Sequence, residues 1–315
     1  MAQPATAVQD GRLTVAIAGG TGNIGTHVVK AFLNPSIHLN TFPRVLVLTR
    51  NSNSHAAKEL EKLGAELVQT DGLLEAEALR SKSVDVLVSC LGQNVAIEEK
   101  GALYKAAIDG GVKVYFPTEY GIDHRIDEAK HKVWDDKKKH SRAAREASGE
   151  NIKIIQLYNG HFMEDAIGPW YALDTKNRHY TSIGPSTSKF TLTSKDDVGA
   201  SIVRLALLAV GDPNSVPNEV RISGDAKSYQ ELASIMGSES DEKIDITEQN
   251  VDEYKASLGP LGADPAPVIR VIIGSGLMDY TKENNNELVN PGELVWKWKK
   301  VEQYAKEVKG KPWCD

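Results

Sequence analysis

The residues best placed to do chemistry are the glycines of residues 15–25, which read VAIAGGTGNIG. They fit two related patterns, G-x-G-x-x-G and G-x-x-G-x-x-G, and an apolar run precedes them while a stretch with helical spacing follows. Strand, turn and helix therefore come in the order that a dinucleotide site needs. Glycines let backbone N–H groups approach a pyrophosphate, and the helix N-terminus adds partial positive charge. The alternative is an ordinary glycine turn, but we predict that the cofactor is bound here by Gly19, Gly20, Thr21, Gly22, Asn23, Ile24 and Gly25.

The end of the second predicted strand indicates which dinucleotide binds. NAD-binding proteins place a carboxylate there for the ribose hydroxyls, whereas residues 49–52 read TRNS. Arg50 could pair with a 2′-phosphate, and Asn51 could hydrogen-bond the same group. We therefore predict NADPH or NADP as the cofactor, the alternative being that Arg50 is only a solvated strand-end charge. Gly92 and Gln93, which follow the fourth strand, are predicted to contact the phosphate or ribose of the cofactor.

One common arrangement for hydride chemistry is missing from the sequence. Many dehydrogenases with such glycines use Y-x-x-x-K, in which the lysine lowers the pKa of the tyrosine. No tyrosine of this chain has a lysine four residues later. The proton-transfer group must therefore be sought in other segments.

Four other segments carry a family pattern. They read VKVYFPTEYG, VWDDKKKHSR, YNGHF and KDDVG, at residues 112–121, 133–142, 158–162 and 195–199. In this order they resemble the isoflavone reductase-like family of atypical short-chain dehydrogenase/reductases, which includes phenylcoumaran benzylic ether and pinoresinol–lariciresinol reductases. They also resemble the broader NmrA-like group of regulators. The match covers the N-terminal two thirds of the chain and is thin beyond.

The family motifs map onto particular residues. The R-F-x-P-S-E-F-G motif is matched by PTEYG at residues 117–121, and F-x-x-K by WDDK at residues 134–137. D-I-G is matched by Asp197, Val198 and Gly199, and we expect Asp197 to cap its helix. The resemblance implies that Lys137 is the active-site lysine and that Pro117 and Thr118 lie beside the cofactor. It places in the substrate pocket Glu119, Tyr120, Asn159, Gly160 and Phe162.

The helical spacing around Lys137 supports this role. Lys137, His140, Ser141 and Ala144 follow the i, i+3, i+4, i+7 pattern and so share one face of the predicted helix. A lysine beside the cofactor can act as general acid or base if burial or a nearby positive charge lowers its pKa. Lys138 is the candidate if the register differs by one residue, and a solvated basic patch is the alternative without chemistry.

His161 is the second candidate for catalysis, and it departs from the family. The plant reductases read S-N-C-F where this chain has NGHF. A histidine there could hydrogen-bond a substrate oxygen, relay a proton or simply pack. Because the segment differs, no plant substrate can be transferred to this chain.

The first half of the chain alternates apolar strands with helices. Strands are predicted at 15–18, 44–49, 65–70, 84–90, 112–116 and 152–157, and helices at 26–33, 56–63, 74–80, 98–108 and 133–147. Such alternation is typical of a parallel sheet covered on both faces. We therefore predict an α/β fold with a doubly wound parallel sheet of the Rossmann type and a smaller C-terminal α/β substrate lobe.

The alternation breaks down after Phe162. Strands are predicted at 190–193 and 220–222, and helices at 197–208, 229–236 and 293–308. We expect a flexible tail at 1–10, an NADP-binding Rossmann domain at 11–162 and a substrate-binding lobe at 163–315. Parts of 188–210 are expected to pack back on the first domain.

The composition excludes several classes of partner. The net charge of −6 argues against nucleic acid, and the apolar runs are far shorter than the ~20 residues that span a membrane. With two cysteines and no metal-ligand spacing, neither a disulfide framework nor a metal site is expected. Residues 1–10 lack the features of a secretory signal, and together with the few cysteines this predicts a cytoplasmic protein, the alternative being an organelle reached without an N-terminal signal. Monomer and homodimer are both left open by the sequence.

Together these patterns predict an NADPH-dependent reductase. Its acceptor would be a small aromatic, phenylpropanoid-like or enone molecule, with Lys137 assisting proton transfer, as the resemblance implies. The alternative is an NADP(H)-sensing NmrA-like regulator that performs no chemistry. The lysine in the F-x-x-K position favours the enzyme, because a sensor has no need of it.

Overall fold

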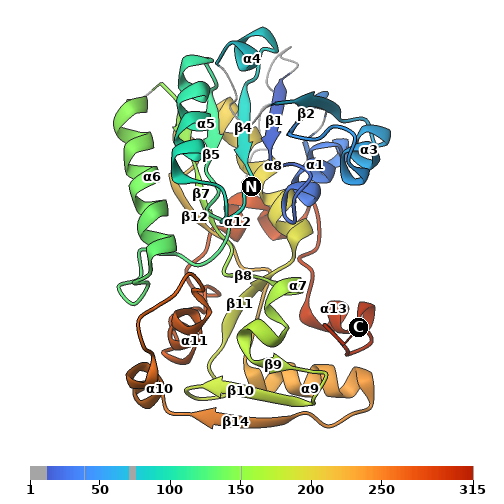
Figure 1. Cartoon of the computed structure of the whole chain (residues 1–315). Coiled ribbons are helices and arrows are strands. Elements are labelled where there is room, and N and C mark those ends of the chain that lie inside the picture. The colour runs from blue at the N-terminus through green and yellow to red at the C-terminus, as the bar shows by residue number, and fades with distance from the viewer. Residues whose placement is uncertain (1–12, 39, 71–75, 150, 315) are drawn as a thin grey trace.

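The computed structural model describes residues 13–38, 40–70, 76–149 and 151–314. The tail expected at 1–10 and the first two residues of the helix expected at 74–80 lie outside these ranges. Within the described part, no helix is both long enough and apolar enough to cross a membrane. Figure 1 shows an upper and a lower part of the molecule, with a parallel sheet in the upper part and smaller sheets in the lower part.

A six-stranded parallel sheet forms the upper part of the molecule. Its strands lie in the order β3-β2-β1-β4-β5-β6. The order reverses beside β1, so the chain winds outward in both directions and the predicted doubly wound fold is confirmed. The strands are β1 (Thr14–Ala18), β2 (Arg44–Thr49), β3 (Glu66–Gln69), β4 (Val86–Ser89), β5 (Val114–Phe116) and β6 (Lys153–Ile154).

Helices cover both faces of this sheet. One face carries α4 (Ala76–Ser81), α5 (Ile97–Asp109) and α6 (Lys132–Ser148), which pack side by side. The other carries α1 (Gly25–Phe32), α2 (Pro35–His38), α3 (His55–Lys62) and α8 (Lys195–Gly211). Alternate residues of β1 point to opposite faces, so Val15 and Ile17 join one core cluster while Ala16 and Ala18 join another.

Helix α8, from the later part of the chain, packs against the parallel-sheet part of the molecule. It packs along α1, and a Cβ on Gly199 would lie 2.9 Å from the carbonyl oxygen of His27. Only glycine allows this approach of two helix backbones. The division of the chain at residue 162 stays a prediction.

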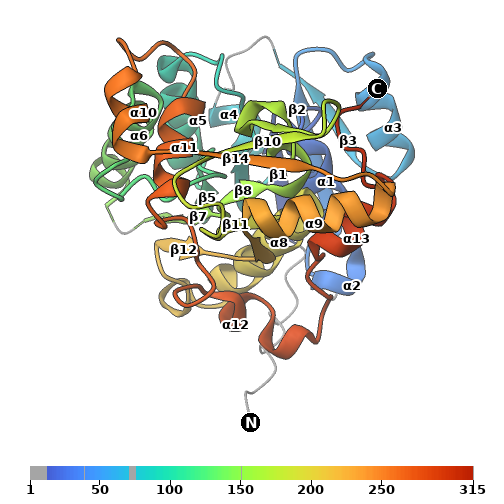
Figure 2. The same ribbon diagram turned by 90° about the horizontal axis from the view of Figure 1, so that it is seen from below.

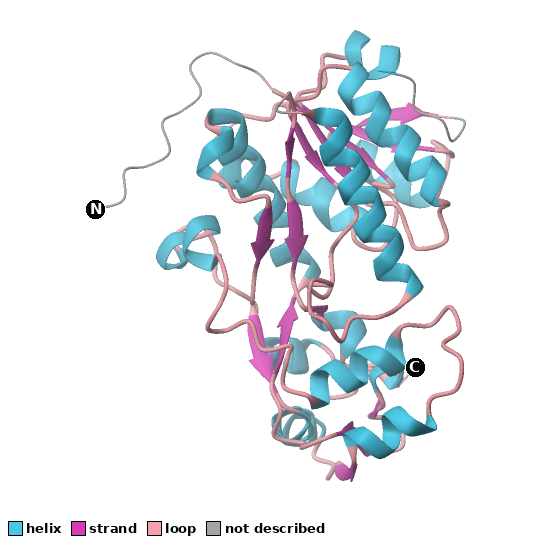
Figure 3. Ribbon diagram, turned by 90° about the vertical axis from the view of Figure 1, so that its left-hand side faces the viewer, coloured by secondary structure: helices cyan, strands magenta, loops and turns pink. Residues whose placement is uncertain are grey.

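The lower part contains small sheets and short helices. One three-stranded sheet joins β8 (His161–Phe162), β11 (Phe190–Thr193) and β13 (Asp225–Lys227), and another joins β9 (Leu173–Asp174), β10 (His179–Ile183) and β14 (Asp245–Gln249). Seen from below, β10 and β14 run across the foreground (Figure 2). The side view shows this lobe stacked under the parallel sheet (Figure 3). Its helices are α7 (Met163–Ala166), α9 (Tyr229–Ser240), α10 (Val251–Ser257), α11 (Ala266–Gly274), α12 (Asn286–Val289) and α13 (Val301–Glu307), with 3-10 turns at Pro169–Tyr171, Pro213–Ser215 and Pro291–Glu293.

The strand predicted at 152–157 is two strands with different partners. The backbone N–H of Ile155 still donates to Tyr115 of β5, but that of Gln156 donates to Asn218. The chain thus leaves the parallel sheet after β6, and β7 (Gln156–Tyr158) pairs with β12 (Glu219–Arg221). An apolar run shows that a strand is buried but not which strand pairs with it.

The helix predicted at 293–308 is wrong over its first half. Helix α13 begins only at Val301. The Asp197 carboxylate accepts the backbone N–H of Lys299 at 2.9 Å, and the Asn290 side chain bonds the backbone of Val295 and Trp296. These hydrogen bonds take up backbone groups that a helix would need.

The cap predicted at Asp197 is also wrong. The N-cap of α8 is Ser194, whose hydroxyl accepts the N–H of Asp197.

Candidate active site

The turn between β1 and α1 is shaped for close approach to a ligand. Gly19 adopts a positive φ of 75°, and a Cβ on Gly25 would lie 2.1 Å from the Gly19 carbonyl oxygen. That oxygen also accepts the N–H of Gly22 at 2.9 Å. No side chain in the described part of the chain caps the N-terminus of α1 at Ile24. The turn therefore presents backbone and the positive end of a helix, as a pyrophosphate site requires.

A cavity of about 350 Å³ extends from this turn across the carboxyl ends of β1, β2 and β4. Arg50, at the end of β2, is exposed on its wall, and Asn51 lies beside it. Ser54, the N-cap of α3, and Glu99 of α5 also line the cavity, and the sequence analysis missed both. The predicted cofactor residues that line it are Gly19, Thr21, Gly22, Arg50, Asn51 and Gly92.

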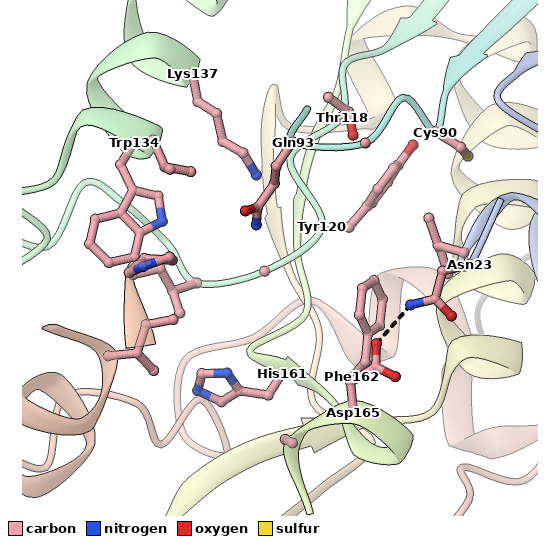
Figure 4. A pocket seen from close by; sticks show the side chains of 18 of the residues that line it. Asn23, Cys90, Gln93, Thr118, Tyr120, Trp134, Lys137, His161, Phe162 and Asp165 are labelled. Carbon is pink, nitrogen blue, oxygen red and sulfur yellow. Dashed lines mark hydrogen bonds between the residues drawn. The ribbon is translucent and has the colours of Figure 1, made fainter. Parts of the chain in front are cut away.

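A second cavity of about 360 Å³ lies next to the first, at the loop that follows β4. The two cavities share Gly22, Cys90, Leu91 and Gly92, so they are neighbours along one cleft. Predicted site residues that line the second are Gly22, Asn23, Ile24, Gly92, Gln93, Thr118, Tyr120, Lys137, Gly160, His161 and Phe162. Figure 4 shows several of them from the inside.

Three predicted residues line none of the described cavities. Gly20 is packed between the side chains of Val29 and Val47, and Gly25 is pressed against Gly19. Asn159 is fully buried. Pro117 and Glu119 line a third, smaller cavity beside Lys137. Close packing at Gly20 and Gly25 shapes the turn, and their contact with the cofactor stays a prediction.

The Lys137 side chain reaches from α6 to the wall of the second cavity. Its Nζ donates to the backbone carbonyl of Glu119 at 2.7 Å and lies 4.0 Å from Oε2 of the same residue. Burial lowers the pKa of Lys137, while the Glu119 carboxylate opposes this change. Lys138, the next residue on α6, is not among the residues that line the described cavities.

Glu119 is a buried carboxylate held on both oxygens. Oε1 accepts the Ser141 hydroxyl at 2.9 Å and the Gln156 amide at 3.2 Å, and Oε2 lies 3.0 Å from His124 Nε2. Burial alone would raise the pKa of Glu119. The hydrogen bond from His124 and the charge of Lys137 outweigh burial and hold that pKa below its usual value. A fixed negative charge therefore lies behind the lysine.

His161 lies across the cavity from Lys137. It belongs to β8, is 4% exposed, and its Nδ1 is 2.9 Å from the Tyr171 hydroxyl. Figure 4 shows the two side chains reaching into the cavity from opposite sides. The space between them is bordered by the aromatic rings of Tyr120, Trp134 and Phe162.

Several residues of this cavity carry no signal in the sequence. Lys100 of α5 lines it, and both burial and the charge of Lys137 lower the pKa of Lys100. Trp170, Pro265 and Ile269 come from the lower lobe. No spacing rule connects residues that lie so far apart along the chain. Only packing brings them together.

A polar contact joins the glycine turn to the lower lobe. The Asn23 amide donates to Asp165 Oδ2 at 2.9 Å, and Lys195 Nζ donates to Asn23 Oδ1 at 2.7 Å. Lys195 and Asp165 also pair at 2.5 Å. Among the described residues, no group of three or more His, Cys, Asp or Glu side chains could hold a metal ion.

The chain is similar to known proteins over most of its length. The model of the NmrA-like family matches residues 12–304. The phenylcoumaran benzylic ether reductase PT1 of Pinus taeda is 29% identical over 251 residues, which are 75% of this chain and 76% of that protein.

Solved structures share the fold. AtPrR2, solved with NADP+ and (+)-pinoresinol, has a TM-score of 0.75 at 20% identity and covers 94% of this chain and 98% of its own. The leucoanthocyanidin reductase–NADPH complex of Vitis vinifera has a TM-score of 0.73 at 21% identity, covering 95% and 100%.

Proposed function

The chain belongs to the NmrA-like family, and from this premise we propose that it is an NADPH-dependent reductase of small aromatic acceptors. The observation that carries the proposal is the position of Lys137 Nζ. It lies on the wall of an aromatic-lined cavity that shares Gly22, Cys90, Leu91 and Gly92 with the cleft at the glycine turn. A cofactor in the cleft and an acceptor in the cavity would therefore meet.

The residues of the cleft fit NADPH or NADP. The turn at Gly19–Gly25 leaves backbone N–H groups and the uncapped N-terminus of α1 for the pyrophosphate. Arg50 and Asn51, which line the cleft, would bind the 2′-phosphate, and Ser54 would add a hydroxyl. Gln93 and Thr118 lie further along, toward the second cavity. The cofactor, when bound, supplies a hydride from its nicotinamide ring.

Lys137 has the task of moving a proton. Its backbone anchor on Glu119 fixes Nζ at the cavity wall, and its lowered pKa brings proton release closer to neutral pH. In its charged form it would donate a proton to, or stabilise negative charge on, an acceptor oxygen. Glu119 takes no proton itself, because hydrogen bonds and the neighbouring lysine keep it ionised.

The shape of the second cavity favours an aromatic acceptor. Flat rings from Tyr120, Trp134 and Phe162 offer stacking surfaces and keep bulk water out of the space beside Lys137. Orientation against these rings would align the electrophilic carbon of the acceptor with the cofactor. One relative is named a phenylcoumaran benzylic ether reductase, which supports an aromatic acceptor here. A cytoplasmic location and the lack of a nucleic-acid partner stay predictions.

The test is NADPH oxidation against a panel of phenylpropanoid, enone and quinone acceptors, for wild type, Lys137→Ala and Lys138→Ala. We expect Lys137→Ala to lose roughly 100-fold or more in kcat, within the usual range for an acid–base group, while NADPH affinity persists. Lys138→Ala is the matched control, one residue along the same helix, and should keep its activity.

Two outcomes would count against the proposal. Equal turnover by the Lys137→Ala variant would remove the lysine from the chemistry and leave the reductase class standing. Tight NADPH binding with no turnover across the panel would favour an NADP(H)-sensing regulator. A protein partner recovered in a redox-dependent way would then support that second function.

A further inference from the structure

The ring of His161 is held in one orientation by its surroundings. Nδ1 is 2.9 Å from the Tyr171 hydroxyl, and the ring packs edge-on against Tyr171 and Phe190 at centroid distances of 4.9 and 5.7 Å. Both neighbours are buried. The histidine therefore cannot turn to exchange its two nitrogens without breaking its bond to Tyr171.

Among the residues that the structure describes, the second ring nitrogen has no hydrogen-bond partner. Nε2 of His161 is buried and makes no hydrogen bond within the described part of the chain, although the residue lines the second cavity. A buried polar atom without a partner is costly, so such atoms are rare in folded proteins. A ligand that enters this cavity and offers a matching group would satisfy it.

We propose that His161 Nε2 is a specificity contact for an uncharged oxygen of the acceptor, at the end of the cavity opposite Lys137. The inference rests on the proposed function for the class of ligand, since it deepens that same site. It assigns the acceptor two oxygen functions, one facing Lys137 and one facing His161, with an aromatic body between them. The two side chains reach into the cavity from opposite sides (Figure 4).

The surroundings of His161 favour binding over proton transfer. Burial lowers the pKa of His161 to about 3, so the ring stays neutral at ordinary pH. Burial also raises the pKa of Tyr171, so this hydroxyl keeps its proton. A neutral ring with a fixed partner can donate or accept one hydrogen bond, depending on which of the two groups gives the proton at Nδ1.

A binding experiment tests this contact, because it does not depend on turnover. The probes are benzylideneacetone and its 4-hydroxy and 4-methoxy derivatives, titrated calorimetrically into the NADP+-loaded protein. The ketone oxygen suits Lys137, and the para oxygen suits His161. Wild type should bind at least one para-oxygenated probe roughly tenfold more tightly than the parent compound. A preference for hydroxy over methoxy would identify Nε2 as an acceptor, and tight binding of both would identify it as a donor.

Two substitutions separate the contact from the fold. In His161→Asn the amide can replace Nδ1 and keep the bond to Tyr171, but it does not reach the cavity. This variant should bind all three probes within about twofold of each other, by losing affinity only for the oxygenated ones. His161→Gln, whose amide extends toward the position of Nε2, should recover part of the preference. Lys137→Ala should keep it.

Equal affinity of wild type for the three probes, absence of binding, or a preference that survives in His161→Asn would each overturn the inference. If NADPH is never oxidised but the preference exists and is lost in His161→Asn, the contact stands while the reductase proposal fails. If NADPH is oxidised but no probe is preferred, the reductase proposal stands and the His161 contact fails.

Discussion

Lys137 and Glu119 lie close enough that the charge of each shifts the pKa of the other. The lysine is drawn toward its neutral form by burial and back toward its charged form by the carboxylate. Because Nζ also donates to the Glu119 backbone, the position of the lysine does not depend on the carboxylate alone. The position and the pKa of Lys137 can therefore be altered separately.

Replacing Glu119 by Gln should shift the pH profile of the reaction to lower pH. The substitution removes the negative charge that favours protonated Lys137, so the pKa of the lysine falls further below its usual value. The limb of kcat/KM against pH that reports Lys137 moves to lower pH whether the lysine serves as acid or as base. Because His124, Ser141 and Gln156 lose a charged acceptor, we also expect a loss of about 1–3 kcal/mol in the free energy of unfolding.

Ser141→Ala is the control for this experiment. It removes one hydrogen bond to Glu119 but keeps the carboxylate, so it should cost about 1 kcal/mol of stability and leave the pH limb in place. If the same limb of kcat/KM against pH does not move in Glu119→Gln, a group other than Lys137 titrates in the reaction.

At the scale of elements, the glycine turn is supported from outside the parallel sheet. Asn23 of the turn is bonded by Asp165 of α7 and Lys195 of α8, so two later helices fix its side chain. Lys195 itself is buried and pairs with Asp165. The geometry of the cofactor cleft thus depends on residues far along the chain.

Lys195→Met should therefore weaken both the fold and cofactor binding. The Met side chain keeps the length of the lysine but leaves Asp165 and Asn23 without their shared donor. Asp165 remains one third exposed, so we expect a modest loss of about 1–2 kcal/mol in the free energy of unfolding. The dissociation constant for NADPH should rise roughly three- to tenfold as the turn loses its support.

Urea unfolding and NADPH titration measure the two effects. Lys189→Met is the matched control, because Lys189 pairs with Glu231 on the surface, where an ion pair adds little stability. Equal NADPH affinity in wild type and Lys195→Met would show that the contact serves only the fold.

For the whole molecule, one cleft brings the two halves of the chain together. The first cavity is built from the parallel sheet, while the second is closed by His161, Phe162 and Asp165 and by α11 of the lower lobe. A ligand that binds the folded cleft but not the unfolded chain stabilises the entire protein.

NADPH should accordingly raise the melting temperature. At about 100 times its dissociation constant it adds roughly 2.7 kcal/mol, which corresponds to about 4 °C for a chain of this length. NADH at the same concentration should give a smaller shift, because it lacks the 2′-phosphate that we propose Arg50 binds. Arg50→Gln should reduce the NADPH shift to the NADH value, as measured by thermal unfolding. An NADPH shift unchanged in this variant would contradict the role of Arg50.

Much of the first half of the fold could be predicted from the sequence. Strand β2 matches the range predicted at 44–49, and the other predicted strands and helices up to α6 agree with the structure within a few residues, whereas the short helix α2 was not predicted. Apolar runs and glycine turns are local signals, because they report how one segment meets water and its own backbone. For the same reason Lys137 could be found, since the helix spacing and the family motif both lie within its own segment.

The remaining features depend on contacts that no local signal records. The split of residues 152–157 follows from β7 choosing β12 as its partner, and residues 294–300 are kept from helix by bonds to Asp197 and Asn290. The sequence by itself determined the doubly wound sheet, the cofactor turn and the lysine. Only the tertiary structure decided what surrounds the lysine: the buried Glu119 behind it, and His161, which lines the same cavity. The physical reason is that burial and pairing are properties of a position in space, and residues far apart in the chain create that position together.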